Sequence, residues 1–228
     1  MKYFLTLFCV IIQNLFSTYH SHVGQDRFVN EQFFKNVRNG IFVDIGAHNG
    51  VTINNTYFFE KELGWTGICV EPIPSVFKEL QRNRKCILVE GCVTDWSGEG
   101  LFCMITGTCQ MLSGLVGKYD PRHIERIQRE IAIYGGYGEF INVKCYLFNE
   151  LLEKYGITHV NFLSLDTEGG EFDIISSIDF DRFHIDVITV EDNFGDKRFI
   201  PFLESKGFKF VQTLEMDMVF VNKNFVPQ

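Results

Sequence analysis

The stretch FVDIGAHNG, residues 42–50, joins a short apolar run to a carboxylate and to two glycines four positions apart. The apolar part, residues 41–45, has the continuous hydrophobic character of a parallel strand that is covered on both faces. In the turn that follows, glycine allows backbone N–H groups to approach a ligand that a side chain would block. An ordinary turn needs at most one glycine, so the pair favours a ligand-binding loop at the end of a buried strand.

The rest of the chain alternates between strand-like and helix-like segments. Further strands are expected at residues 67–71, 86–93, 141–145, 160–166, 186–191, 208–213 and 218–222. Helices are expected at residues 51–63, 74–83, 147–155, 171–178 and 198–206. A short extra strand at 101–105, a Gly/Ser-rich loop and a charged helix at 121–134 interrupt this rhythm. The pattern predicts an α/β fold with a mostly parallel sheet, helices on both faces and a C-terminal antiparallel hairpin.

Length and composition indicate one domain. A chain of 228 residues suits a single sizeable α/β domain, which we assign to residues 21–228. Residues 106–138 are expected to form an insertion over the ligand-binding end of the sheet, where such insertions often carry substrate contacts. The 24 phenylalanines indicate a phenylalanine-rich core, and the net charge of −8 argues against a nucleic-acid partner.

The first 20 residues have the composition of an apolar leader. The stretch from Tyr3 to Ile12 is too short to span a bilayer as a helix, but it has the length of the hydrophobic region of a signal peptide. Ser17 is the best position for cleavage, although Leu15 before it is a poor partner. Residues 1–20 are therefore expected to be a signal peptide, an anchor or an apolar packing helix.

The cysteines favour a different location from the one that a signal peptide implies. The seven cysteines include no CxxC pair, and several of them lie inside apolar, strand-like runs. In such runs cysteine behaves as a small buried hydrophobe. We expect free thiols, which favour a reducing compartment.

Acidic residues follow each of the main expected strands. Because the carboxyl ends of parallel strands meet at one edge of a sheet, these side chains are expected to share one rim. They are Asp44, Glu71, Asp95, Asp166 with Glu168, and Glu191. A single acid after a strand is commonly a helix N-cap. Acids at five strand ends repel one another, which indicates a bound group that is cationic or donates hydrogen bonds.

The loop sequence limits the kind of ligand. A dinucleotide fold would carry GxGxxG and a P-loop would carry GxxxxGK[ST], and the chain has neither motif here. Asp44 before the turn disfavours a phosphate, while Glu71 on the next strand has the place of an acid that binds two ribose hydroxyls. A nucleoside that carries positive charge fits both residues. S-adenosylmethionine, with its sulfonium, ammonium, ribose and adenine groups, is such a ligand.

The chain resembles the FkbM family of S-adenosylmethionine-dependent methyltransferases, within the class I methyltransferase superfamily. The resemblance covers about residues 21–222. The matching motifs are Gly24-Gln25-Asp26, FVDIGAHNG, ICVEPIP, VTDWSGE, MLSGL, LSLDTEGGE and ITVEDN. The resemblance implies a Rossmann-like class I methyltransferase fold, with a seven-stranded sheet whose last strand is antiparallel. His48 and Asn49 stand where many class I enzymes have smaller residues, so the resemblance does not fix the path of this loop.

The resemblance also implies roles for individual residues. Asp44, Gly46 and Gly50 would shape the methionine end of the cofactor pocket, and Glu71 would bind the ribose hydroxyls. Asp95 would border the adenine with the backbone at Val93, although a turn residue is the alternative for Asp95. The expected cofactor-binding residues are Asp44, Gly46, Ala47, Gly50, Glu71, Val93, Asp95 and Asp166.

A methyl acceptor with a neutral hydroxyl benefits from a base that takes up its proton. Asp166 is the first candidate and Glu168 the second, and Glu191 reaches the same rim; these are the expected catalytic residues. No metal is assigned, although such an acidic cluster also has the oxygen ligands of a divalent cation site.

Three further side chains are expected to have no catalytic role. Glu171 is expected to be a first-turn helix acid that favours the helix dipole. His123 is expected to be a surface histidine. Asn54 lies in a glycosylation sequon but beside the cofactor loop, and we expect it to remain unmodified.

The leading hypothesis is an O-methyltransferase that uses S-adenosylmethionine and acts on a hydroxyl of a sugar in a glycan or of a small metabolite. The alternatives are an exported or membrane-tethered domain that keeps the fold as a binding module and, less favoured, an NAD-linked oxidoreductase. The expected partner is a small-molecule or glycan acceptor, without nucleic acid, and with membrane association only through the leader. Cofactor supply and free thiols favour the cytoplasm, whereas a functional signal would place the protein in the secretory route.

Overall fold

The computed structural model describes residues 19–226. The apolar stretch of the expected leader, Tyr3 to Ile12, lies outside these residues, so the leader stays a prediction. Within residues 19–226, no helix combines the length and the apolar character that crossing a membrane requires.

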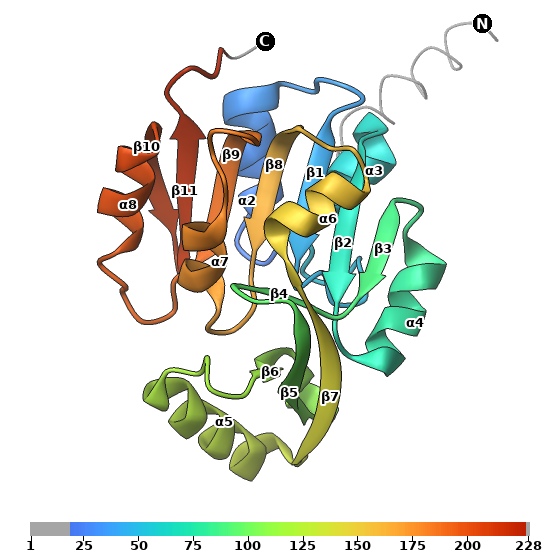
Figure 1. The fold of residues 1–228 in the computed structure, drawn as a ribbon. Helices are drawn as coiled ribbons and strands as arrows, with labels where there is room; N and C mark the ends of the chain where they lie inside the picture. The colour runs from blue at the N-terminus through green and yellow to red at the C-terminus, as the bar shows by residue number, and fades with distance from the viewer. Residues whose placement is uncertain (1–18, 227–228) are drawn as a thin grey trace, which may run out of the picture.

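A large twisted sheet organises the described part of the chain (Figure 1). Its seven strands have the order β10-β11-β9-β8-β1-β2-β3 within residues 19–226. They are β1 (Ile41–Ile45), β2 (Thr66–Glu71), β3 (Ile87–Glu90), β8 (His159–Leu165), β9 (His184–Glu191), β10 (Phe208–Leu214) and β11 (Asp217–Asn222). All neighbours pair in parallel except β11, which is antiparallel to both β9 and β10. The predicted mostly parallel seven-stranded sheet with an antiparallel C-terminal hairpin is confirmed.

Helices cover both faces of this sheet, as the βα rhythm predicts. One face packs against α6 (Phe148–Lys154), α7 (Glu171–Ser177) and α8 (Phe199–Ser205). The other face packs against α2 (Gln25–Val29), the π-helical turn η1 (Asn30–Phe34), α3 (Tyr57–Leu63) and α4 (Pro74–Asn83). Because successive residues of a strand point to opposite faces, Val43 and Ile45 of β1 join the first core and Phe42 joins the second. Both cores are rich in phenylalanine, as composition predicts.

A smaller sheet lies beyond the carboxyl ends of β1, β2 and β8 (Figure 1). Within residues 19–226 its four strands have the order β4-β7-β5-β6. They are β4 (Cys92–Thr94), β5 (Gly98–Ile105), β6 (Gly114–Leu115) and β7 (Gly138–Leu147), joined by the 3-10 turn η2 (Gly107–Leu112) and by α5 (Pro121–Tyr134). The charged helix predicted at 121–134 is confirmed as α5, and the Asp120 side chain caps it by accepting the Arg122 N–H at 2.8 Å.

The smaller sheet was not predicted, and it changes two expected strands. The strand expected at 86–93 is divided at Gly91 into β3 and β4, which belong to different sheets. A Cβ at Gly91 would lie 2.4 Å from the Lys144 carbonyl oxygen, so glycine is needed where the chain passes close to β7. The strand expected at 141–145 is the middle of β7 and pairs with β5 rather than with the large sheet.

The helix expected at 51–63 begins only at Tyr57, the first residue of α3. Two asparagines hold the preceding residues in turns. Asn49 Oδ1 accepts the N–H groups of Val51 and Thr52, and Asn54 Oδ1 accepts those of the next turn. Side-chain hydrogen bonds of this kind compete with the helical backbone pattern, which the apolar periodicity of the segment does not reveal.

Candidate functional site

A cavity of about 220 Å³ opens at the carboxyl ends of β1, β2, β8 and β9. Its wall on the sheet side includes Ile45, Gly46, Glu71, Ile73, Val93, Asp166, Glu168 and Glu191. Its other wall comes from the segment between β5 and β7 and includes Gln110, Met111, Leu112, Leu115, Lys118 and Arg126. Residues of the segment at 106–138 therefore form one wall of this cavity.

Gly46 is fixed by the close approach of two strand ends. Its φ is +88°, and a Cβ at this position would lie 1.7 Å from the Asp166 carbonyl oxygen. The Gly46 N–H also donates to the Val70 carbonyl at 3.1 Å. Any side chain here would separate β1 from β8, and Gly46 itself lines the cavity.

Gly50 and Ala47 do not line the cavity, which differs from the prediction. A Cβ at Gly50 would meet Leu80 Cδ1 at 2.5 Å and Arg84 Cγ at 2.6 Å, so Gly50 allows the loop to pack against α4. The backbone of Ala47 donates to the Val70 carbonyl at 3.0 Å and accepts the Asn54 side-chain amide at 3.1 Å. Both residues shape the loop from behind.

Asp44 also faces away from the cavity, contrary to the predicted contact with a cationic cofactor. It lies two residues after Phe42 on β1 and therefore points to the same face, toward α3 and α4. Its carboxylate accepts hydrogen bonds from Thr56 Oγ1 at 2.6 Å and Asn54 Nδ2 at 2.8 Å. Burial raises the pKa of Asp44, while the positive charge of Arg84 and these two bonds lower it. Asp44 is a structural acid of the loop.

Arg84 supplies the positive charge that balances the carboxylates of Asp44 and Glu60. It is 3% exposed, and its guanidinium donates to Glu60, to Thr56 Oγ1 and to the Gly50 carbonyl. The buried side chain of Asn54, which lies in the sequon, donates to Asp44 and accepts from Arg84. An asparagine that is 4% exposed and bonded in this way gives an oligosaccharide no access.

His48 occupies the position in the loop that the resemblance left undefined. Its backbone has φ +48°, and its ring lines the cavity with Nε2 at 3.4 Å from Gln110 Oε1. Its buried Nδ1 has no hydrogen-bond partner among the described residues. Burial lowers the pKa of His48, so the neutral imidazole is favoured and an unsatisfied polar atom is left beside the cavity.

Glu71, the predicted ribose-binding acid, ends β2 and lines the cavity. Its Oε1 accepts the Ile73 N–H at 2.7 Å, which fixes the direction of the carboxylate. Burial raises the pKa of Glu71 to about 7, although the backbone N–H groups of Ile73 and His48 favour the ionised form. A buried carboxyl with free acceptor capacity is well suited to a pair of hydroxyl donors.

Asp95 lies outside the cavity wall, whereas Val93 forms part of it. Lys118 Nζ donates to Asp95 at 2.8 Å and also pairs with Asp173. The hydrogen bond from Lys118 is the main cause of the lowered pKa of Asp95. The structure thus favours the alternative of a turn residue for Asp95, tied to the segment over the rim.

Asp166, Glu168 and Glu191 converge at the rim, with carboxylate oxygens within 4.8 Å of one another. The Asp166 side chain is exposed at the cavity. Desolvation by the surrounding protein, and then repulsion from Asp217 and Glu171, raises its pKa to about 7. The pKa values of Glu168 and Glu191 are raised strongly, first by burial and then by their acidic neighbours. Without a cation the cluster therefore retains protons near neutral pH. Its geometry also admits a divalent cation.

Glu168 has the most unusual surroundings of the three. Its backbone has φ +60°, a conformation that non-glycine residues rarely adopt and that is frequent at functional sites. Its Oε2 lies 3.4 Å from His123 Nδ1 and 3.7 Å from an Arg126 nitrogen, and accepts the Asn193 amide at 3.3 Å.

His123 is fully buried, which corrects the prediction of a surface histidine. Its Nε2 lies 3.1 Å from the Leu112 carbonyl, which can only accept, so the ring proton is on Nε2. Its Nδ1 has no hydrogen-bond partner among the described residues and faces Glu168. Burial lowers the pKa of His123, which favours the neutral ring with a free lone pair on Nδ1.

Glu171 is the first residue of α7, as predicted, but it is buried rather than solvated. Its carboxylate accepts the N–H groups of Thr167 and Gly169 and the Thr167 hydroxyl. It holds the loop that carries Asp166 and Glu168 in shape.

Gln25 and Asp217 line the cavity and were not predicted as site residues. The Gln25 amide donates to Asp217 Oδ2 at 2.6 Å, and burial raises the pKa of Asp217 to about 6. Gln25 stands in one of the motifs of the resemblance, which was the available signal. Asp217 begins β11 and follows a turn, and nothing in the local sequence connects it to β1.

The cavity has the chemistry that S-adenosylmethionine requires. Glu71 offers acceptors for ribose hydroxyls, and the acidic cluster offers negative charge for the ammonium and sulfonium groups. Apolar side chains suited to adenine line the same cavity: Ile73, Val93, Phe102, Leu112 and Leu115. The six cysteines of the described part are free thiols, as predicted.

Comparison with known proteins agrees with this chemistry. The sequence model of the methyltransferase FkbM domain matches residues 44–226. Similar solved structures include M. capricolum TrmK in complex with S-adenosyl-homocysteine, at 9% identity and TM-score 0.44 over 90% of this chain and 70% of that one. They also include the METTL16 MTase domain, at 11% identity and TM-score 0.43 over 87% and 64%. No curated protein sequence matches. The chain belongs to the FkbM methyltransferase family and is an S-adenosylmethionine-dependent methyltransferase.

Proposed function

We propose that the protein transfers the methyl group to a hydroxyl oxygen of a sugar, in a glycan or in a small metabolite. One observation carries the proposal: Glu168 and Glu191 line the cofactor cavity and also a second cavity of about 550 Å³. An acceptor in the second cavity would meet the methyl donor at these two carboxyls.

The lining of the second cavity suits a polyhydroxylated acceptor. It combines charged and amide side chains with aromatic rings: Asp120, Arg122, Asp173, Asp192, Asn193, Asp196, Arg198, Phe172, Phe194 and Phe199. Carboxylates and amides accept and donate hydrogen bonds to hydroxyl groups, and rings cover the apolar faces of a sugar. Arg122 lies over the Phe194 ring at 4.6 Å, so charge and ring are presented together.

The cofactor-side roles follow from which groups face the first cavity. Glu71 accepts hydrogen bonds from the ribose hydroxyls, Gly46 allows close backbone approach, and Asp166 pairs with the ammonium group. When bound, the cofactor supplies an electrophilic methyl carbon and positive charge. Asp166 lines the first cavity but not the second. We therefore assign Asp166 to cofactor binding, and it is no longer the first candidate for the general base.

Glu168 is the proposed general base. Burial, and then repulsion from neighbouring acids, raises the pKa of Glu168, and positive charge in the cofactor cavity opposes this rise and so favours the ionised base. His123 Nδ1, with its free lone pair, lies 3.4 Å from Glu168 Oε2 and can receive the proton that Glu168 takes from the hydroxyl. Arg126 and Asn193 hold the carboxylate toward the shared boundary of the two cavities.

The test is a methyl-transfer assay with isotope-labelled cofactor and a panel of sugars, glycans, amines and carboxylic acids. We expect labelled ether products from hydroxyl acceptors, and loss of their formation in Glu168→Gln with the affinity for S-adenosylhomocysteine retained. Glu125→Gln, at an exposed position of the same helix α5, is the matched control and should stay active. Methylation of amines alone, or full activity of Glu168→Gln, would contradict the proposal.

A further inference from the structure

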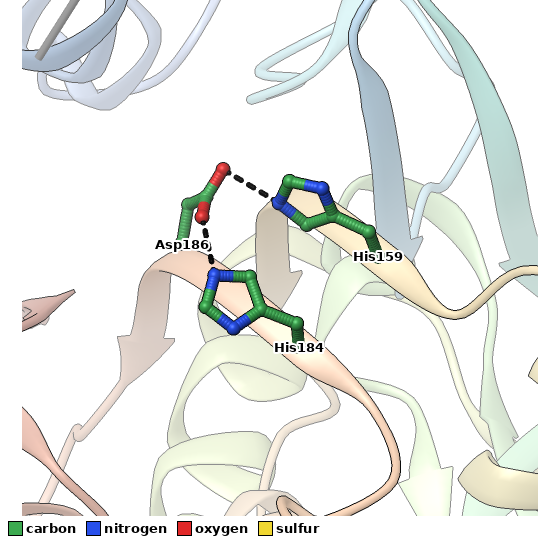
Figure 2. A group of neighbouring side chains, drawn as sticks. All are labelled: His159, His184 and Asp186. Atoms are coloured by element: carbon green, nitrogen blue, oxygen red, sulfur yellow. Dashed lines mark hydrogen bonds and ion pairs between the residues drawn. The ribbon is translucent and has the colours of Figure 1, made fainter. Parts of the chain in front are cut away.

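A separate group of polar residues lies at the opposite end of β8 and β9. His159 is the first residue of β8 and His184 the first of β9, and the two are register partners in the parallel ladder. Asp186 follows His184 by two positions and therefore points to the same face of the sheet. Figure 2 shows the two imidazole rings directed at the Asp186 carboxylate, one from each strand.

The ligand atoms of this group converge. His159 Nε2 lies 2.9 Å from Asp186 Oδ2, and His184 Nε2 lies 3.0 Å from Asp186 Oδ1. All three ligand atoms lie within 4.8 Å of one another. In a tetrahedral zinc site with bonds of about 2.0 Å, ligand atoms are separated by roughly 3.3 Å. Shifts of a few tenths of an ångström in flexible side chains would therefore admit an ion.

The carboxylate is already held in place. The Asp186 side chain is 6% exposed, and Asn161 Nδ2 donates to its Oδ2 at 2.8 Å. Asn161 is fixed in turn, because its Oδ1 accepts the Ile41 N–H of β1 at 2.8 Å. A ligand that is oriented by a second hydrogen-bonded residue is typical of metal sites.

The imidazoles are accessible. The side chains of His159 and His184 are 50% and 48% exposed, so an ion can enter from solvent and keep water on its remaining positions. Two imidazole nitrogens and one carboxylate select transition metals over Mg²⁺ or Ca²⁺, which prefer oxygen ligands.

We propose that His159, His184 and Asp186 bind one divalent transition-metal ion of the zinc type, with water completing its coordination. The site joins the first residues of the two central strands β8 and β9, at the rim opposite the cofactor cavity. Its role is to stabilise the fold, and it is independent of the methyl-transfer proposal.

The experiment is a calorimetric titration of Zn²⁺ into tag-free, chelator-treated, fully reduced protein. Excess Mg²⁺ is present to occupy the carboxylate cluster of Asp166, Glu168 and Glu191. We expect one equivalent to bind and to raise the melting temperature. The double variant His159→Asn, His184→Asn should lose this equivalent, and His20→Asn, at a histidine outside the group, should keep it.

Asn161→Ala gives a graded readout, because it leaves all three ligands in place and releases the carboxylate. We expect binding to weaken about 10- to 100-fold. Absorption of bound Co²⁺ without a thiolate charge-transfer band should exclude the free cysteines as ligands. The proposal is overturned if the unaltered protein binds no zinc, if the double variant binds it equally, or if the thiolate band appears.

Discussion

Asp44 and Asp166 lie at the ends of neighbouring parallel strands, and the pKa of both is raised, yet Asp44 is buried and Asp166 is exposed at the cavity. Asp44 has a buried cation, Arg84, and hydrogen bonds from Asn54 and Thr56. Asp166 has other carboxyls as its neighbours and faces a cavity. An acid whose partners are all within the fold holds a loop in place. An acid whose neighbours are other acids remains available to a cationic ligand.

The largest effect is expected when the Asp44 group is broken. Asp44→Ala leaves Arg84 buried with one fewer counter-charge, and we expect the free energy of unfolding to fall by about 3–5 kcal/mol. Urea denaturation measures this loss. Asp166→Ala should show no comparable loss; equal destabilisation by the two variants would remove the distinction between them.

The next effect concerns turnover. Glu168→Gln removes the proposed base, and a general base contributes about 10²- to 10⁴-fold to rate. We expect kcat to fall by about that factor while the KM for the cofactor changes little. A parallel fall in cofactor affinity would instead show that Glu168 binds the cofactor rather than serving the acceptor as a base.

A smaller effect separates Glu71 from Asp95. Glu71→Ala removes the proposed ribose acceptor, and hydrogen bonds to a charged group contribute about 1.5–3 kcal/mol, or roughly 10- to 100-fold in affinity. Asp95→Ala, outside the cavity wall, is the matched control and should leave the affinity for S-adenosylhomocysteine within about twofold. Calorimetry that finds the reverse order would restore the predicted adenine contact of Asp95.

The smallest effect is on the stability of the ligand-free protein. The folded-state pKa of Asp166, about 7, lies above its ordinary value of 3.8. The folded state therefore binds the proton more tightly, and stability is lost as pH rises from about 4 to about 7. Asp166→Asn removes this loss. Because the side chain faces a cavity that water enters, we expect a gain of only about 1 kcal/mol at pH 8.

The gain should be smaller at pH 5, where the folded state keeps the proton. Thermal melts of both proteins at the two pH values measure it. A variant that is less stable than the unaltered protein at pH 8 would show that Asp166 is satisfied within the fold.

The large sheet was predictable because apolar runs and turn residues recur along the chain at βα spacing. The exact bounds of some strands were not predictable, because contacts with residues distant in the sequence determine them. Gly91 divides one expected strand because β7 passes beside it, and β7 is some fifty residues away in the sequence.

Within the site, the acids at or shortly after strand ends were predictable as groups at the cavity: Glu71, Asp166, Glu168 and Glu191. The direction of Asp44 was the main error. Its position in the motif suggested a ligand contact, but the alternation of β1 turns it toward Arg84, a residue from the end of α4. The expectation of a surface position for His123 was wrong because its burial depends on how α5 packs over η2, which the charged sequence of α5 does not reveal.

The central claim is that the acidic cluster is completed by the positive charge of the cofactor. Calorimetric titration of S-adenosylmethionine, which carries both the sulfonium and the ammonium charge, near pH 7 in buffers of different ionisation enthalpy measures the protons exchanged on binding. We predict saturable binding with proton release, affinity that increases as pH rises through 7, and loss of the release in the double variant Asp166→Asn, Glu191→Gln. Binding without proton exchange, or no binding at all, would contradict the account.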